Sequence, residues 1–190
     1  MDLFCNGIAN WCKKNSAISD EDYPIVIYGI RVILNTSIKL LGIFLTGVLL
    51  QQLPAVLLST TVFCSMRYWT GGWHSESHMG CFCTMLIPCV GPSLLAEISG
   101  GWIPWVSGLM AIYSIYKVLR YAPCNSRVNP IEDVKILKLK RVGSIAEVII
   151  VNAGVLLGFS TEMKWLIGLP LFIEAILIPK RAHVACYAIK

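Results

Sequence analysis

Charged residues are scarce in this 190-residue sequence: they make up 14% of it, whereas hydrophobic residues make up 56%. Soluble globular domains carry about 25% charged residues. One core of this size cannot bury so many apolar side chains, and a lipid bilayer is the natural solvent for the excess. The net charge of +5 comes from cations that lie between apolar runs and form no basic stripe. We therefore expect these cations to set membrane topology, and we expect no nucleic-acid partner.

The sequence also lacks features that favour other classes of protein. The opening residues MDLFCNGIANWCKK contain neither a basic n-region nor an unbroken apolar h-region, so no cleavable signal peptide is expected. There is no internal repeat and no low-complexity segment, which favours a single membrane domain over residues 1–190. Eight cysteines are present, but secreted disulfide scaffolds are short, loop-rich and soluble. Most of these cysteines are therefore expected to be reduced packing residues.

Six apolar runs follow an amphipathic N-terminal segment, residues 1–23. Apolar side chains share one face of this segment at helical spacing, which predicts a helix lying in the membrane interface, although a soluble cap helix fits the same pattern. These side chains are Leu3, Phe4, Ile8, Trp11 and Cys12. The runs cover approximately residues 34–51, 54–67, 81–99, 102–120, 144–160 and 164–179. They predict an all-α, polytopic membrane helix bundle of about six transmembrane segments.

Lysine and arginine predict the orientation of the bundle. Cations precede the first run, fill the segment 121–143 and follow the last run, whereas the turns on the other side contain a single basic residue, Lys164. Cytoplasmic loops carry the excess of Lys and Arg. Both termini, the loop 67–80 and the loop 121–143 are therefore predicted to be cytoplasmic.

Glu147 lies inside the fifth apolar run and Glu174 inside the sixth. An ionisable group at such a depth is costly and usually faces a partner or water. We therefore predict that Glu174 points into the helix bundle.

The segment 67–81 concentrates reactive side chains at the boundary between the second and third runs. Cys81 opens the third run, where the positive end of the helix dipole and unpaired N–H groups favour a thiolate. His74 is a candidate base that can also protonate a leaving amine. Straight helix would separate the two residues by about 10 Å. A catalytic dyad of His74 and Cys81 therefore requires a turn between them.

Three alternatives compete with a cysteine protease. His74, His78 and Cys81 stand at i, i+4 and i+7, so on an unbroken helix they would share one face. Together with Cys83 or Glu76 they suit zinc or copper. A second alternative makes the histidines ordinary interfacial residues and the cysteine a packing residue. In a third alternative, Arg67 only anchors the membrane topology and Gly71-Gly72 only forms a tight turn.

The pattern Arg67-x3-Gly71-Gly72-x-His74-x6-Cys81 resembles the signature of the accessory gene regulator B (AgrB) family. That family consists of bacterial membrane endopeptidases that process a quorum-sensing propeptide. A second patch resembles the family too: Tyr121-Ala122-Pro123, then Asn129-Pro130-Ile131 and a basic run through Arg141. Chain length, the number of apolar runs and the amphipathic N-terminus are similar as well. The resemblance therefore covers nearly the whole chain.

The resemblance implies a role for individual residues. Cys81 matches the nucleophile of a cysteine peptidase, and His74 matches its general base. Arg67 and Gly72 match positions near the catalytic centre. Glu76 is the nearest candidate to orient His74. No cofactor and no metal are expected.

His78 and Cys83 have no assigned role in the family pattern, which weakens the metal hypothesis. The implied substrate is an AgrD-like signalling propeptide with an amphipathic N-terminal helix, a small central region and an acidic tail. Such a tail would be attracted to the basic segment. The candidate substrate-binding cations are Lys135, Lys138, Lys140 and Arg141.

The implied activity is cleavage of the propeptide's C-terminal tail, with support for closure of a thiolactone or lactone ring. The implied location is the bacterial cell membrane, with membrane lipids as further partners. The family also favours a homodimer, which no residue of this sequence supports independently. The competing function is non-enzymatic, either a metal-handling transporter or a partner-binding scaffold. Stoichiometric zinc or copper in the purified protein would favour that alternative.

Overall fold

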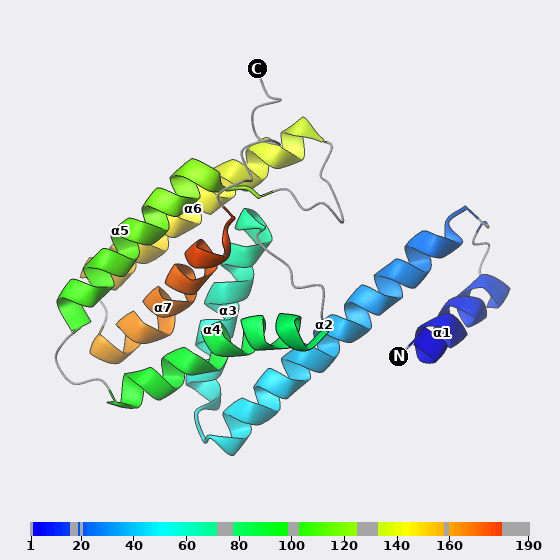
Figure 1. The fold of residues 1–190 in the computed structure, drawn as a ribbon, viewed down its shortest axis with the longest axis horizontal. Helices are drawn as coiled ribbons and strands as arrows, with labels where there is room; N and C mark the ends of the chain where they lie inside the picture. Colours follow the sequence, from blue (N-terminus) through cyan, green and yellow to red (C-terminus); the bar gives the residue numbers. More distant parts are fainter. Residues whose placement is uncertain are drawn as a thin grey trace. The chain divides into compact units, whose positions relative to one another are not determined.

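The computed structural model describes residues 2–15, 19, 21–71, 78–98, 103–124, 133–157 and 160–179. Over these residues the chain forms seven α-helices (Figure 1). They are α1 (Asp2–Asn15), α2 (Tyr23–Leu49), α3 (Leu53–Thr70), α4 (His78–Ile98), α5 (Ile103–Tyr121), α6 (Val134–Leu157) and α7 (Thr161–Leu177). The all-α prediction is confirmed, with one helix for the N-terminal segment and one for each apolar run.

The helices belong to two compact units, residues 1–45 and residues 46–190. The first unit contains α1 and most of α2. The Tyr23 hydroxyl donates a hydrogen bond to the side-chain oxygen of Asn10, and the Lys13 ammonium lies 5.1 Å from the centroid of the Tyr23 ring. These contacts join α1 to the start of α2. Trp11 is 67% exposed, as expected for the apolar side of an interfacial helix.

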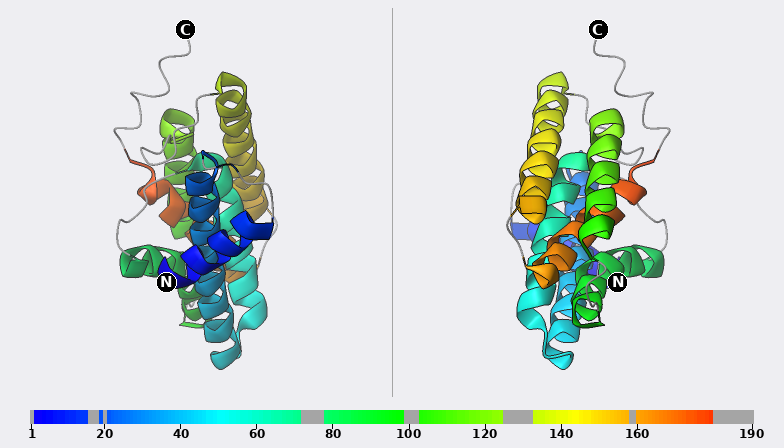
Figure 2. Two further views of the ribbon diagram at one scale, coloured as in Figure 1. Left: turned by 90° about the vertical axis from the view of Figure 1, so that its right-hand side faces the viewer. Right: turned by 90° about the vertical axis from the view of Figure 1, so that its left-hand side faces the viewer.

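In the second unit, α7 lies among the other helices. It contacts each of α3, α4, α5 and α6. Figure 2 shows α3, α5 and α6 running alongside one another, with α7 crossing between them. The central helix of this unit is therefore the one that carries Glu174.

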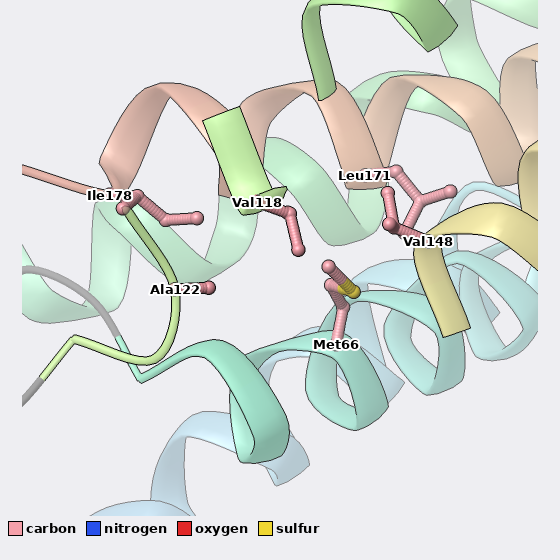
Figure 3. Packing of buried hydrophobic residues seen from close by; sticks show 6 residues of the cluster. All are labelled: Met66, Val118, Ala122, Val148, Leu171 and Ile178. Atoms are coloured by element: carbon pink, nitrogen blue, oxygen red, sulfur yellow. The ribbon is translucent and has the colours of Figure 1, made fainter. Parts of the chain in front are cut away.

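A cluster of buried side chains fills the second unit near the C-terminal ends of α3, α5 and α7 (Figure 3). Its members are Met66, Val118, Ala122, Val148, Leu171 and Ile178. Inside a bilayer such contacts are favoured by van der Waals packing rather than by exclusion of water. The cluster therefore fixes the ends of these helices, which carry the polar residues described below.

The start of α2 lies well before the predicted start of the first apolar run at residue 34. Pro24 occupies the first turn, where the missing N–H of proline has no intrahelical acceptor to lose. Arg31 interrupts the apolar run but not the helix, because arginine is a good helix former. The helix is consequently longer than its apolar portion.

The predicted loops 67–81 and 121–143 are partly helical, which corrects their bounds. α3 continues to Thr70 and α4 begins at His78. α6 begins at Val134, so the four candidate substrate-binding cations lie on a helix. Lysine and arginine favour helix nearly as strongly as leucine does. A stretch that is too charged to cross a bilayer therefore still continues the helix.

Two segments of the described chain have the length and apolar composition of a membrane span. They are Tyr23–Leu49, with a mean hydropathy of 1.8, and Met79–Glu97, with a mean hydropathy of 1.7. α5 also presents an apolar face, because Trp105, Leu109 and Ile112 are 86%, 69% and 68% exposed. A contiguous apolar surface of this kind suits contact with lipid. The number of crossings stays a prediction.

Candidate functional site

The last turn of α3 is the part of the predicted site that the structure shows best. It ends at Gly71, whose φ of 69° lies in a region that favours glycine. The N–H group of Gly71 donates a 3.0 Å hydrogen bond to the carbonyl oxygen of Arg67. The first glycine of the Gly-Gly pair therefore ends the helix and turns the chain.

Gly71 also lies directly against Cys124. The N–H group of Cys124 donates a 2.7 Å hydrogen bond to the carbonyl oxygen of Thr70, and Gly71 and Cys124 pair as a parallel bridge. A Cβ at residue 71 would overlap the carbonyl oxygen of Cys124. The preceding Ala122–Pro123 bond is cis. The two sequence patches that carry the family resemblance are thus in contact.

Glu174 reaches the same turn from α7. Arg67 Nη1 donates to both carboxylate oxygens, at 3.0 and 3.3 Å, and the Thr70 hydroxyl donates to Oε1 at 2.8 Å. Glu174 is fully buried, whereas the Arg67 side chain is 20% exposed. The prediction that Glu174 points into the bundle is confirmed. Glu147, within the fifth apolar run, is half-buried and accepts a hydrogen bond from the Ser65 hydroxyl.

Lys140 reaches the turn from α6. Its ammonium group donates a 2.6 Å hydrogen bond to the carbonyl oxygen of Tyr68 and lies 4.4 Å from the centroid of the Tyr68 ring. Lys140 precedes the predicted span at 144–160, and partial burial there lowers the pKa of its ammonium group. It therefore contributes to the fold at this position, while Lys135, Lys138 and Arg141 are exposed.

Close packing between α3 and α6 continues at Trp69 and Gly143. A Cβ at residue 143 would overlap the indole ring of Trp69. The same indole makes an edge-to-face contact with Tyr68, with ring centroids 5.0 Å apart. Absence of a side chain at residue 143 is thus what lets the end of α3 approach α6.

Lys117 holds the ends of α5 and α7 together. Its ammonium group is buried and donates a 2.7 Å hydrogen bond to the carbonyl oxygen of Ile178, directly after α7. It also lies 5.0 Å from the centroid of the Tyr121 ring. A cation at the C-terminal end of a helix complements the helix dipole. Through these contacts the C-terminal ends of α3, α5 and α7 and the start of α6 meet at one end of the second unit.

Cys81 is the fourth residue of α4 and lies in its first turn. It is half-buried, and its carbonyl oxygen accepts a 2.9 Å hydrogen bond from the Thr84 hydroxyl. Cys83 is exposed. The seven described cysteines form no disulfide with one another.

Several predicted site residues lie outside the described part of the chain. They are Gly72, His74 and Glu76, together with the side chain of His78. The dyad of His74 and Cys81, the turn between them and the alternative metal site therefore stay predictions. Among the side chains that are described, no three His, Cys, Asp or Glu residues gather as metal ligands would.

Sequence reasoning missed the contributions of Thr70 and Cys124. Thr70 is fully buried and stands immediately before the Gly-Gly pair. A hydroxyl at the end of an apolar run is a usable signal, because a buried hydroxyl needs a hydrogen-bond partner. Cys124 acts through its backbone, which no side-chain pattern indicates.

The fold and this cluster of polar contacts define an all-α membrane protein whose second unit has the buried charged groups Lys117 and Glu174 at one end of its helix bundle. The chain belongs to the accessory gene regulator B family, whose model matches residues 5–178.

Curated relatives agree with this assignment at low identity. An AgrB-like protein of Clostridium perfringens strain SM101 is 24% identical over 132 residues, which cover 66% of this chain and 62% of the relative. An AgrB-like protein of Clostridium beijerinckii is 26% identical over 131 residues, which cover 67% of this chain and 64% of the relative. The chain thus spans less than two thirds of the length of either relative. No solved structure matches this chain.

Proposed function

We propose that this protein is a membrane-embedded cysteine endopeptidase that removes the C-terminal tail of an AgrD-like signalling propeptide. Cys81 is the nucleophile and His74 is the general base. The observation that carries the proposal is the half-buried position of Cys81 in the first turn of α4. The N–H groups of a first turn stabilise negative charge, and the thiolate is the nucleophilic form of cysteine. Membership of the family supports a role in the accessory gene regulator system.

The reaction has two steps. The thiolate of Cys81 attacks the carbonyl carbon of the scissile bond, the C–N bond breaks, and protonated His74 gives its proton to the leaving amine. The acidic tail departs and a thioester joins the propeptide to Cys81. A thiol or hydroxyl of the propeptide itself then attacks the thioester carbon and gives its proton to neutral His74. The carbon–sulfur bond to Cys81 breaks, which releases the Cys81 thiolate and closes a thiolactone or lactone ring.

Two further residues of the segment 67–81 have proposed roles. Gly71 is already packed against Cys124, so close approach of the substrate backbone falls to Gly72. Glu76 orients the imidazole of His74. Arg67, the first residue of this segment, is held at the end of α3 by Glu174.

Recognition of the propeptide is assigned to the exposed cations at the start of α6, Lys135, Lys138 and Arg141. An acidic tail is attracted to such a surface, and salt weakens the attraction because the charges are exposed. Lys140 differs from them, because its ammonium group is engaged with Tyr68.

The proposed location is the bacterial cell membrane, with six crossings and both termini in the cytoplasm. An even number of crossings, one for each of α2 to α7, places the C-terminal ends of α3, α5 and α7 and the start of α6 on the same side. The contacts of Lys140 with Tyr68, Cys124 with Thr70 and Lys117 with the end of α7 support this arrangement. The concentration of Lys and Arg favours the cytoplasmic side.

Four alanine variants, matched for membrane expression, test the function by cleavage of the propeptide with and without a chelator. Cys81→Ala and His74→Ala should each abolish cleavage, because nucleophile and base act as a unit. His78→Ala and Cys83→Ala should keep most of the activity, since the mechanism does not use them. Comparable loss in all four variants, with rescue by added zinc, would show a metal site instead.

A further inference from the structure

Glu174 is a fully buried carboxylate that no step of the proposed reaction uses. It lies on the central helix α7, four residues before Ile178, within a predicted membrane span. A buried charge is retained only where it is paired and hydrogen-bonded, because its transfer from water is costly. The hydrogen-bond partners of Glu174 therefore indicate the role of its carboxylate.

Both partners of the carboxylate lie on the last turn of α3. Arg67 Nη1 donates at 3.0 and 3.3 Å, and Thr70 Oγ1 donates at 2.8 Å. Residues at i and i+3 share one face of a helix. One carboxylate thus holds this turn at two points, and the turn is directly followed by Gly71, where the chain leaves the helix.

A second observation shows that the same turn is fixed from its other sides. The carbonyl oxygen of Tyr68 accepts from Lys140 at 2.6 Å, and the carbonyl oxygen of Thr70 accepts from the N–H group of Cys124 at 2.7 Å. Those hydrogen bonds fix the backbone of the turn, whereas Glu174 contacts the side chains of Arg67 and Thr70. Together these contacts fix the last turn of α3 up to Gly71.

We propose that Glu174 is a positioning residue: through Arg67 and Thr70 it sets the direction in which the chain leaves α3 toward His74. The inference rests on the proposed function, since it assigns a task to the segment between Gly71 and Cys81. Glu174 touches no reacting atom. It acts on the rate by placing His74 relative to Cys81, and a small misplacement of a catalytic group is sufficient to slow a reaction strongly.

The decisive variant is Glu174→Gln, which keeps the shape of the side chain and removes its charge. The matched control is Glu147→Gln, because Glu147 is a half-buried carboxylate that also bonds α3, through Ser65 and away from the last turn. The full-length protein is purified in detergent, its folded fraction is measured by thermal unfolding, and kcat and KM are measured with a synthetic AgrD-like propeptide.

Glu174→Gln should lower kcat per folded molecule by about 10- to 100-fold, with KM nearly unchanged. Glu147→Gln should stay within about twofold of the wild type. The rate at which iodoacetamide alkylates Cys81, followed by mass spectrometry, provides a readout that does not need the substrate. In Glu174→Gln this rate should move toward the value in His74→Ala, in which the base is absent.

The inference is overturned if Glu174→Gln loses only yield or thermal stability, while kcat per folded molecule and the alkylation of Cys81 stay at wild-type values. If Glu174→Gln does not accumulate, Thr70→Val decides, because it keeps the ion pair and removes one hydrogen bond to the carboxylate. A fall in its kcat of about 3- to 10-fold supports the inference, and an unchanged kcat rejects it. Cleavage by Cys81→Ala at the wild-type rate would reject the proposed function, which is a separate outcome.

Discussion

The ammonium group of Lys140 and the carbonyl oxygen of Tyr68 are joined by a 2.6 Å hydrogen bond across 72 residues of sequence. A cation at the C-terminal end of α3 satisfies a carbonyl group that has no partner within the helix and complements the helix dipole. Lys140 therefore differs in kind from its neighbours Lys135, Lys138 and Arg141, which are exposed.

Lys140→Met and Lys138→Met should consequently have different effects. Lys140→Met should lower the free energy of unfolding by about 1–2 kcal/mol, because it removes a charged hydrogen-bond donor. Lys138→Met should change it by less than about 0.5 kcal/mol, but it should raise KM for the propeptide and reduce the dependence of KM on salt. Denaturant unfolding in detergent and kinetics at two salt concentrations measure these effects. Equal unfolding free energies for the two variants would contradict the role assigned to Lys140.

Gly71→Ala should be strongly destabilising. The φ of 69° is unfavourable for alanine, and the new Cβ would overlap the backbone of Cys124. We expect a loss of about 1–3 kcal/mol or more in the free energy of unfolding. Gly108→Ala is the control, because the space around that residue in α5 is open. Alanine favours helix by about 0.5–1 kcal/mol relative to glycine, so the control should be neutral or stabilising. A Gly71→Ala protein as stable as the wild type would contradict the close approach of residues 71 and 124.

Gly143→Ala should separate α3 from α6. The added methyl group would overlap the indole of Trp69, and overpacking of this kind costs about 1–3 kcal/mol. The double variant Gly143→Ala/Trp69→Leu should recover part of that loss relative to the sum of the single changes. The coupling energy expected for residues in contact is about 0.5–3 kcal/mol. A double-mutant cycle of unfolding free energies measures it, and strict additivity would show that the two residues do not meet.

The proposed membrane topology predicts that the start of α6 is accessible to a labelling reagent only from the cytoplasmic side of the membrane. In a variant without native cysteines, Lys138→Cys is exposed and should react with a membrane-impermeant maleimide only after the cells are opened. Native Cys124 should behave in the same way. Labelling of either cysteine from outside intact cells would overturn the proposed cytoplasmic position of the residues between α5 and α6.

Much of the helical architecture could be predicted because apolar runs and helices coincide in a chain of this composition. The ends of helices were less predictable. A charged residue such as Arg31 or Lys140 interrupts an apolar run, but the helical backbone continues through either residue. The apolar runs therefore predict N-terminal ends of α2 and α6 that lie later in the sequence than the observed ends.

The candidate site could be predicted as a set of residue types and only partly as a set of contacts. The pattern from Arg67 to Cys81 gave the segment, and the depth of Glu174 in an apolar run predicted that it faces a partner. One sequence gives no information on which residue that partner is, because Arg67 lies 107 residues away. The contact of Cys124 with Thr70 is made by the backbone and leaves no signal in side-chain chemistry.

The attachment of a single helical turn to three distant segments limits how the protein can be recombined with its relatives. The turn that ends at Thr70 is held by Cys124, by Lys140 and by Glu174. A chimera that exchanges only α3 would combine the helix end of one parent protein with the residues of the other parent at positions 124, 140 and 174. We therefore expect α3 of a relative to fold stably in this chain only when residues 122–124, the start of α6 and the end of α7 are exchanged with it.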